Sequence, residues 1–359
     1  MKKISIFIIL TLIINTQMYA QRPPAITSPE FNADKSITFR YYAPNATRVL
    51  LDAEFLSKPL NMSKDASGIW SVTVPPVEPD IYPYFFHVDS IQVSDPNNSY
   101  LFANERFKRS LIEIRGDKPL VHELQNVPHG KISYHYYKSS TLGTIRQLVI
   151  YTPPGFDNSG KTKYPVLYLI HGGSDTEETW TKVGRANLIA DNLIAQRKAV
   201  PMIIVMPYAN VMPKPLEYFT KDMLNDIIPF IESNYPVSAD SKYRAIAGFS
   251  FGGGQTLNVG LTNTDKFAYV CAYAPYTATE EFRKNFTNWA PDTALLNKQL
   301  KLFFISIAEE DFLYDSVLKV IEMFNEKKIK PETLIVPGGH TWMNCKLYLT
   351  NTLQRLFKY

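Results

Sequence analysis

Cysteine is scarce in this chain, which has only Cys271 and Cys345 among 359 residues. Two cysteines are too few for a disulfide framework, and they could either pair with each other or stay buried. The six histidines are scattered, and no Cys/His group has the spacing of a metal site. The sequence therefore predicts no metal centre and no dependence on a metal or organic cofactor.

An excess of charge of one sign is also missing. Lysine and arginine number 38 against 34 acidic residues, which gives a formal net charge of +4. Two of these positive charges belong to Lys2 and Lys3, in a segment that we expect to be removed. A nearly neutral chain is not typical of a protein that binds nucleic acid.

Long apolar runs are absent after the first twenty residues. Two lysines, an apolar stretch over residues 4–14 and the small residue Ala20 have the layout of a secretory signal over residues 1–20. A membrane anchor is the alternative, but the run is shorter than the roughly 20 residues that cross a bilayer. We expect cleavage near Ala20, export to the periplasm or the medium, and no membrane span afterwards.

Residues 21–115 alternate apolar and polar positions in short runs, separated by Pro, Asn, Asp and Gly. This pattern predicts an all-β sandwich, followed by a linker over residues 116–129. The strands are expected at residues 36–42, 47–52, 70–74 and 83–88.

The pattern changes over residues 130–359, where short apolar runs alternate with helical segments. Such alternation favours an α/β fold with a mostly parallel sheet covered on both faces. Strands are expected at residues 147–151, 166–170, 202–206, 243–247, 302–307 and 333–336. Apolar residues recur at helical spacing over residues 218–234, which predicts a helix with one face in the core.

The candidate nucleophile is Ser250, in the sequence Gly-Phe-Ser-Phe-Gly at residues 248–252. It follows a predicted strand and precedes a run that can start a helix. A nucleophile elbow needs small residues two positions on either side of the serine, because the chain turns sharply there.

An oxyanion hole in such a fold uses the amide after the serine and a second amide from an earlier loop. Phe251 would supply the first amide, and Gly173 or Gly172 the second, just after the strand at residues 166–170. His171 precedes this glycine pair, and we expect it to hold the loop by hydrogen bonding.

The remaining members of a Ser-His-acid triad follow the serine in the order acid, then histidine. His340 is the only histidine after Ser250, and Asp311 directly follows the strand predicted at residues 302–307. Asp315 is a competing acid four positions later. The expected mechanism is attack by Ser250 with His340 as general base and Asp311 as its orienting acid.

Two resemblances to known families extend this interpretation. The front region resembles early-set immunoglobulin-like modules, including carbohydrate-binding ones. The resemblance is carried by residues 43–46, 49–51, 68–70, 82–84 and 95–98. The role of the front region as glycan binder or as spacer stays open. Most of residues 130–359 resembles the esterase D-like enzymes. This second resemblance is carried by residues 171–173, 184–186, 191–194, 201–207, 226–229 and 244–253.

The second resemblance implies an α/β-hydrolase fold, carboxylic ester hydrolysis and the triad named above. That family includes feruloyl and acetylxylan esterases and siderophore esterases of the enterochelin type. Trp180 and Trp342 are expected as aromatic residues that stack on an acyl group or a sugar ring; packing in the core is the alternative for each. Cys345 stands where the family usually has a second tryptophan.

The leading hypothesis is an exported esterase that removes feruloyl or acetyl groups from a hemicellulose such as xylan, so its partner would be an ester-decorated polysaccharide or oligosaccharide. The alternatives are a siderophore ester hydrolase and a glycan-binding protein with an inactive hydrolase fold.

Overall fold

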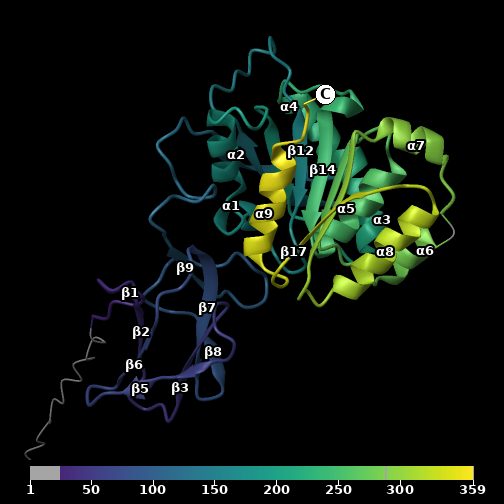
Figure 1. Cartoon of the computed structure of the whole chain (residues 1–359). Helices are drawn as coiled ribbons and strands as arrows, with labels where there is room; N and C mark the ends of the chain where they lie inside the picture. The colour runs from purple at the N-terminus through teal and green to yellow at the C-terminus, as the bar shows by residue number, and fades with distance from the viewer. Residues whose placement is uncertain (1–24, 288, 359) are drawn as a thin grey trace, which may run out of the picture.

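The structure, a computed structural model, describes residues 25–287 and 289–358. The expected signal segment lies outside these residues. Figure 1 shows two parts: a small β sandwich, in purple and blue, and a larger α/β part, in teal to yellow.

The front part consists of two antiparallel sheets that pack face to face. Alternating residues of its strands enclose a core that includes Phe39, Tyr84 and Phe86. This arrangement confirms the expected sandwich. One sheet contains β1 (Glu30–Phe31), β2 (Ile37–Tyr42), β6 (Ile69–Val74) and β5 (Ser63–Lys64). The other contains β4 (Leu60–Asn61), β3 (Val49–Ala53), β7 (Asp80–Val88), β8 (Ile91–Val93) and β9 (Ser110–Ile114).

The larger part is built around one eight-stranded sheet. In spatial order its strands are β10 (Lys131–Ser139), β11 (Thr144–Thr152), β13 (Ile203–Pro207), β12 (Val166–Ile170), β14 (Arg244–Phe249), β15 (Tyr269–Tyr273), β16 (Leu302–Ala308) and β17 (Glu332–Val336). The five pairings from β13 to β17 are parallel.

The sheet is mixed: five of its seven strand pairings are parallel, so the expectation of a mostly parallel sheet holds only for the strands from β13 to β17. The strand β11 runs antiparallel to both of its neighbours, β10 and β13. The hairpin of β10 and β11 forms because the short turn Ser140–Gly143 reverses the chain, with Gly143 at φ 67°. A crossover helix, which parallel pairing requires, is absent between these two strands.

Helices cover both faces of the sheet. They are α1 (Thr179–Lys182), α2 (Ala186–Ala195), α3 (Pro215–Asp222), α4 (Ile228–Asn234), α5 (Phe251–Thr262), α6 (Glu280–Phe286), α7 (Thr293–Gln299), α8 (Tyr314–Glu326) and α9 (Trp342–Leu353). Helix α2 packs beside α9, and α3 packs beside α5.

The helix expected at residues 218–234 is part of a longer helical run. A π-helical segment, Met223–Ile227, joins α3 to α4. Pro229 lies in the first turn of α4 and has no amide hydrogen to donate to the preceding turn. A widened turn just before it accommodates this missing bond.

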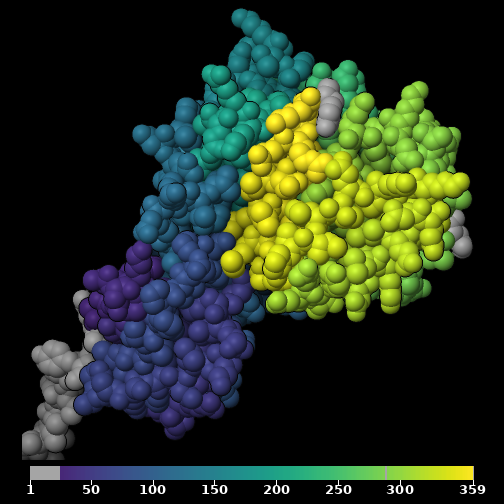
Figure 2. Space-filling view, in the orientation of Figure 1, coloured from purple at the N-terminus to yellow at the C-terminus, as the bar shows by residue number. Residues whose placement is uncertain are grey.

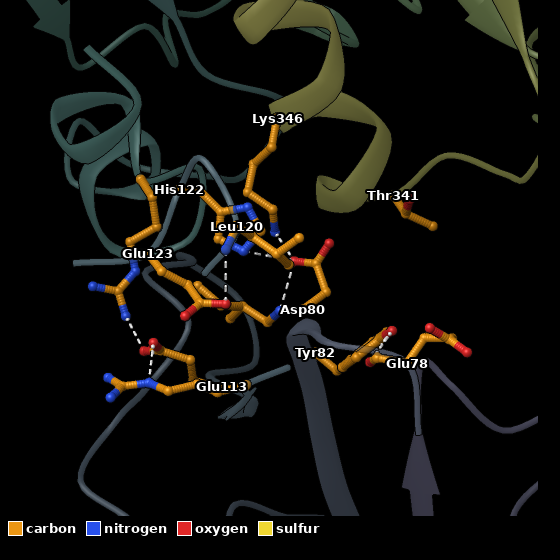
Figure 3. Close-up of polar contacts among 12 residues, drawn as sticks. Glu78, Asp80, Tyr82, Glu113, Leu120, His122, Glu123, Thr341 and Lys346 are labelled. Carbon is orange, nitrogen blue, oxygen red and sulfur yellow. Dashed lines mark hydrogen bonds and ion pairs between the residues drawn. The ribbon is translucent and has the colours of Figure 1, made fainter. Parts of the chain in front are cut away.

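The two parts are in direct contact (Figure 2). Helix α9 contacts β7, and Ile81 of β7 is fully buried within the hydrophobic core of the larger part. Lys346 of α9 forms an ion pair with Asp80 of β7, and both side chains are buried. Nε2 of His122 lies 3.4 Å from the same carboxylate (Figure 3).

Both cysteines are free thiols buried in the larger part, so of the two sequence alternatives the structure shows burial. Within the described ranges, no helix is long and apolar enough to cross a membrane.

Candidate active site

The turn between β14 and α5 places Ser250 at the carboxyl edge of the sheet. Ser250 has φ 56° and ψ −117°, a conformation that L-residues rarely adopt. A Cβ added to Gly248 would lie 2.4 Å from the carbonyl oxygen of Gly252, and one added to Gly252 would lie 2.3 Å from that of His171. Glycine is therefore required at both positions, because neighbouring backbone atoms lie too close to leave room for a side chain. The sequence pattern predicts this requirement.

His340 and Asp311 meet at the same edge of the sheet. Nδ1 of His340 lies 2.7 Å from Oδ2 of Asp311, and the Asp311 side chain is 1% exposed. The backbone amide of Leu313 donates to the other carboxylate oxygen at 2.8 Å. Asp311 follows β16 and His340 follows β17, so two parallel strands deliver the pair. The structure brings Asp311 to His340, and Asp315 forms no hydrogen bond or ion pair with that ring in the described part of the chain.

The imidazole ring of His340 lies beside the elbow. It stacks on Phe249, the residue before Ser250, with ring centroids 4.5 Å apart and an interplanar angle of 25°. Phe312 covers it at 4.7 Å. No hydrogen bond of the Ser250 hydroxyl occurs among the described residues. Such contacts are often long in enzymes without substrate and shorten when substrate binds.

The expected oxyanion amides lie against the serine. A Cβ added to Gly172 would be 3.6 Å from Cβ of Ser250, and one added to Gly173 would be 3.5 Å from Cβ of Phe251. The amide of Phe251 opens helix α5 and has no partner within the helix. The Gly172 amide interacts with the carboxyl group of the buried Asp175, whereas the Gly173 amide donates no hydrogen bond within the described residues. The N–H groups of Phe251 and Gly173 are thus free to bind a developing negative charge.

His171 holds the glycine loop, as expected. Its Nε2 accepts a hydrogen bond from the Ala209 amide at 2.8 Å, so Nδ1 carries the proton and donates to the Gly172 carbonyl oxygen at 2.8 Å. Complete burial lowers the pKa of His171 to about 4. The ring is therefore a neutral support and not a base.

The two tryptophans expected at the substrate pocket lie beneath it instead. Trp180 is fully buried, and its indole N–H donates to the Ile170 carbonyl oxygen at 3.0 Å. Trp342 is 5% exposed and packs edge-on against Trp180, with centroids 4.9 Å apart. Neither offers an open face to a ligand. The prediction that they stack on substrate is wrong because both rings fill the space under the catalytic loops.

The exposed apolar surface near the site comes from residues that the sequence did not single out. Phe312 is 76% exposed beside His340, and Met212 is 76% exposed. Met212 and Phe251 line a cleft of about 860 Å³ with Lys284 and other residues of α3 and α6. In the sequence, the position of Phe312 directly after the candidate acid was the one feature that could have placed it near the active site.

A segment of the front part also reaches the glycine loop. The Glu105 amide donates to the Ser174 carbonyl oxygen at 2.7 Å, and Nδ2 of Asn104 donates to Oδ1 of Asp175 at 3.0 Å. Asp175 is 6% exposed, and its burial raises the pKa of the carboxyl group to about 7. No local sequence pattern indicates this contact, because its two residues lie 71 positions apart.

These features form an arrangement suited to attack on a carbonyl carbon. A hydroxyl stands on a strained turn, an imidazole oriented by a buried carboxylate lies beside it, and free amides face it. No group of three or more His, Cys, Asp or Glu side chains that could hold a metal ion occurs in the described ranges.

Comparison with protein families confirms the resemblance expected from the sequence. Residues 139–303 match the family described as putative esterase. Residues 27–101 match carbohydrate-binding module 48, the isoamylase N-terminal domain.

One relative aligns with nearly the whole chain. An endo-1,4-beta-xylanase/feruloyl esterase of Xylanibacter ruminicola is 27% identical over 349 residues, which is 93% of this chain and 46% of the relative. The chain thus spans less than half of that relative's length.

Solved structures share the fold. A ferulic acid esterase superposes with a TM-score of 0.58 at 24% identity, over 65% of this chain and 99% of that one. The enterobactin esterase of Shigella flexneri superposes with a TM-score of 0.66 at 16% identity, over 90% and 93% of the two chains.

Proposed function

We propose that this chain, whose residues 139–303 match the putative esterase family, is a serine carboxylic ester hydrolase. One observation carries the proposal: the imidazole of His340, held 2.7 Å from Asp311, stacks on the residue that precedes Ser250. A carboxylate, an imidazole and a hydroxyl in this order make up an acyl-transfer site.

In the proposed mechanism His340 removes the proton of the Ser250 hydroxyl as its oxygen attacks the ester carbonyl. The amides of Phe251 and Gly173 stabilise the oxyanion, each contributing roughly 3–4 kcal/mol in comparable sites. The histidine then gives the proton to the leaving alcohol. Water activated by the same ring releases the acid from the acyl-enzyme, and Asp311 stabilises the imidazolium in both steps.

The proposed substrate is a hemicellulose such as xylan that carries feruloyl or acetyl groups. The front region matches a carbohydrate-binding module, and the relative from Xylanibacter ruminicola is named a xylanase and feruloyl esterase. The exposed ring of Phe312 beside His340 is an apolar surface on which a phenolic acyl group would pack. Export of the chain, expected from residues 1–20, belongs to the same proposal, since such a polysaccharide lies outside the cell.

A substrate panel tests this function. Purified full chain is assayed on methyl ferulate, acetylated xylan and a simple aryl acetate, with the Ser250→Ala variant as control. We expect turnover of at least one of the first two substrates and loss of about six orders of magnitude in the variant. Turnover that survives in Ser250→Ala would rule out the serine mechanism.

A siderophore esterase is the second candidate. One observation favours it: the enterobactin esterase superposes over 90% of the chain, the front part included. A catecholate trilactone added to the panel separates the two functions, because only a siderophore esterase would prefer it over ferulate and acetyl esters.

An inactive glycan-binding protein is the third candidate. It would bind xylan and leave every ester in the panel intact. The filled positions of serine, histidine, acid and oxyanion amides argue against it.

A further inference from the structure

A basic hairpin of the front part faces the glycine loop. Arg106, Lys108 and Arg109 lie within four consecutive positions. The hairpin is fixed by a hydrogen bond from the Phe102 amide to the Arg109 carbonyl oxygen at 2.9 Å. It docks on the larger part through the bond from the Glu105 amide to Ser174 described above. The two arginines are therefore presented by an ordered element.

A cavity of about 330 Å³ lies between this hairpin and the glycine loop. Arg106, Arg109 and Phe107 line it on the front side, and Gly173 and Ser174 line it on the other. Because the Gly173 amide belongs to the proposed oxyanion hole, a group bound in the cavity would lie close to the reacting ester. The cavity is thus built by both parts of the chain.

Neither Arg106 nor Arg109 takes part in the ion pairs that other arginines of the described chain form. Arg109 packs over the Phe85 ring, 5.5 Å from its centroid, and interacts with the carboxyl group of Glu54, whose pKa is raised to about 7 by burial. Two other nearby carboxyl groups are engaged elsewhere. Glu105 accepts a hydrogen bond from the Tyr208 hydroxyl, and Asp175 is buried and bonded to Asn104.

We propose that this cavity is a subsite for a carboxylate on the alcohol side of the ester, such as a uronic acid residue of a hemicellulose chain. The proposal rests on the proposed function and adds a substrate class to it. Guanidinium groups bind carboxylates with paired, charge-assisted hydrogen bonds. The ring of Phe107 offers an apolar surface to the sugar. The front part would then select acidic over neutral regions of the polysaccharide.

The experiment compares two acylated xylo-oligosaccharides that differ only in one uronic acid substituent near the ester. The full chain and the double variant Arg106→Gln/Arg109→Gln are assayed on both. We expect the ratio of kcat/KM for the acidic substrate to that for the neutral substrate to fall about tenfold in the double variant, through KM. Lys108→Gln, a change in the same basic run outside the cavity lining, should leave the ratio unchanged.

Salt provides a second readout. Raising the NaCl concentration should increase KM of the wild-type chain for the acidic substrate more than for the neutral one, and this difference should vanish in the double variant. An equal kcat/KM of the wild-type chain for the two oligosaccharides would overturn the proposal. The proposal would also be overturned if Lys108→Gln lowered the ratio of kcat/KM as much as the double variant does.

A catecholate ester forms the last arm, because a phenolate is the other source of negative charge. If the double variant lost about tenfold in kcat/KM on the catecholate ester alone, the assignment to a glycan carboxylate would be overturned. Turnover of a neutral aryl ester, abolished by Ser250→Ala, tests the proposed function separately from the subsite.

Discussion

At the scale of single residues, the sequence offers two possible acids for the triad. The geometry of the folded chain decides between them. Asp311 and Asp315 both follow β16, and their spacing alone does not show which reaches His340. The structure pairs Asp311 with Nδ1 of the ring, and the Leu313 amide fixes the other oxygen of the carboxylate.

Asp311→Asn should lower kcat by roughly four orders of magnitude, because the amide favours the wrong imidazole tautomer and does not stabilise the imidazolium. Steady-state kinetics on an aryl ester measure this loss. Asp315→Asn is the matched control, and a larger loss there than at Asp311 would contradict the assignment.

Gly252→Ala should abolish activity and destabilise the fold. The new Cβ would lie 2.3 Å from the His171 carbonyl oxygen, so the elbow or the glycine loop must move. Overpacking of this kind costs about 1–3 kcal/mol or more in the free energy of unfolding. Gly143→Ala, where nothing lies within 4 Å, carries only the cost of its positive φ and should keep full activity. Urea unfolding and kinetics on both variants check this difference.

Asp175 makes stability depend on pH. Burial raises the pKa of its carboxyl group from 3.8 to about 7, so the folded state binds its proton more tightly than the unfolded state does. The resulting stabilisation is complete below the unfolded value and is lost as pH rises through about 7. Between about pH 5 and about pH 8 this loss amounts to roughly 2–3 kcal/mol.

The variant Asp175→Asn should lose less stability over the same pH range, because its amide carries no titrating proton while its oxygen still accepts from Asn104. The midpoint of urea unfolding at several pH values measures the slope. Parallel slopes for the two proteins would contradict a buried protonated Asp175.

At the scale of elements, the strands that sequence predicted are those with uninterrupted apolar runs. β12 and β16 are buried at every position and were predicted within a residue. β15 was missed, although all its residues are buried. Its sequence Tyr-Val-Cys-Ala-Tyr is short and continues an apolar stretch that also suits a helix, an ambiguity that periodicity does not resolve.

The strand β10 was missed for the opposite reason. It lies at the edge of the sheet, and most of its residues are exposed or half-buried, with tyrosines, lysines and serines along it. Edge strands carry little hydrophobic signal, so the antiparallel hairpin and the mixed sheet were not foreseen. The active-site elements were predictable because the elbow and the two later strand ends have fixed positions relative to the sheet.

The contact between Asn104 and Asp175 makes the front hairpin a support of the glycine loop. Asn104→Ala should lower kcat by between about tenfold and a hundredfold with a smaller effect on KM, because a displaced loop misplaces the oxyanion amides. Asn98→Ala, at a hydrogen bond inside the sandwich, is the control for loss of stability alone. A change in KM without a change in kcat would show that the hairpin does not act on the oxyanion hole.

At the scale of the whole molecule, two contacts join the front part to elements that carry the active site. The hairpin touches the glycine loop, and Asp80 of β7 pairs with Lys346 of α9, the helix that follows His340 (Figure 3). The two parts were predictable from their sequence patterns, but the way they meet was not, because ion pairs between distant positions leave no local pattern.

Lys346→Met should lower the free energy of unfolding by about 3–5 kcal/mol, because it leaves the buried carboxylate of Asp80 without its partner. Lys214→Met removes an exposed pair with Glu217, which solvent screens, and should change the free energy of unfolding far less. Denaturant titration of the two variants compares these costs. Equal costs would show that the contact between the parts contributes little.

The Lys346–Asp80 pair also limits how this chain can be dissected. A fragment that begins after the linker would lack the counter-ion of Lys346 and would expose to water the flank of helix α9 that contacts β7. Such a fragment should be poorly soluble and weakly active, while the intact chain should melt in one cooperative step and not in two.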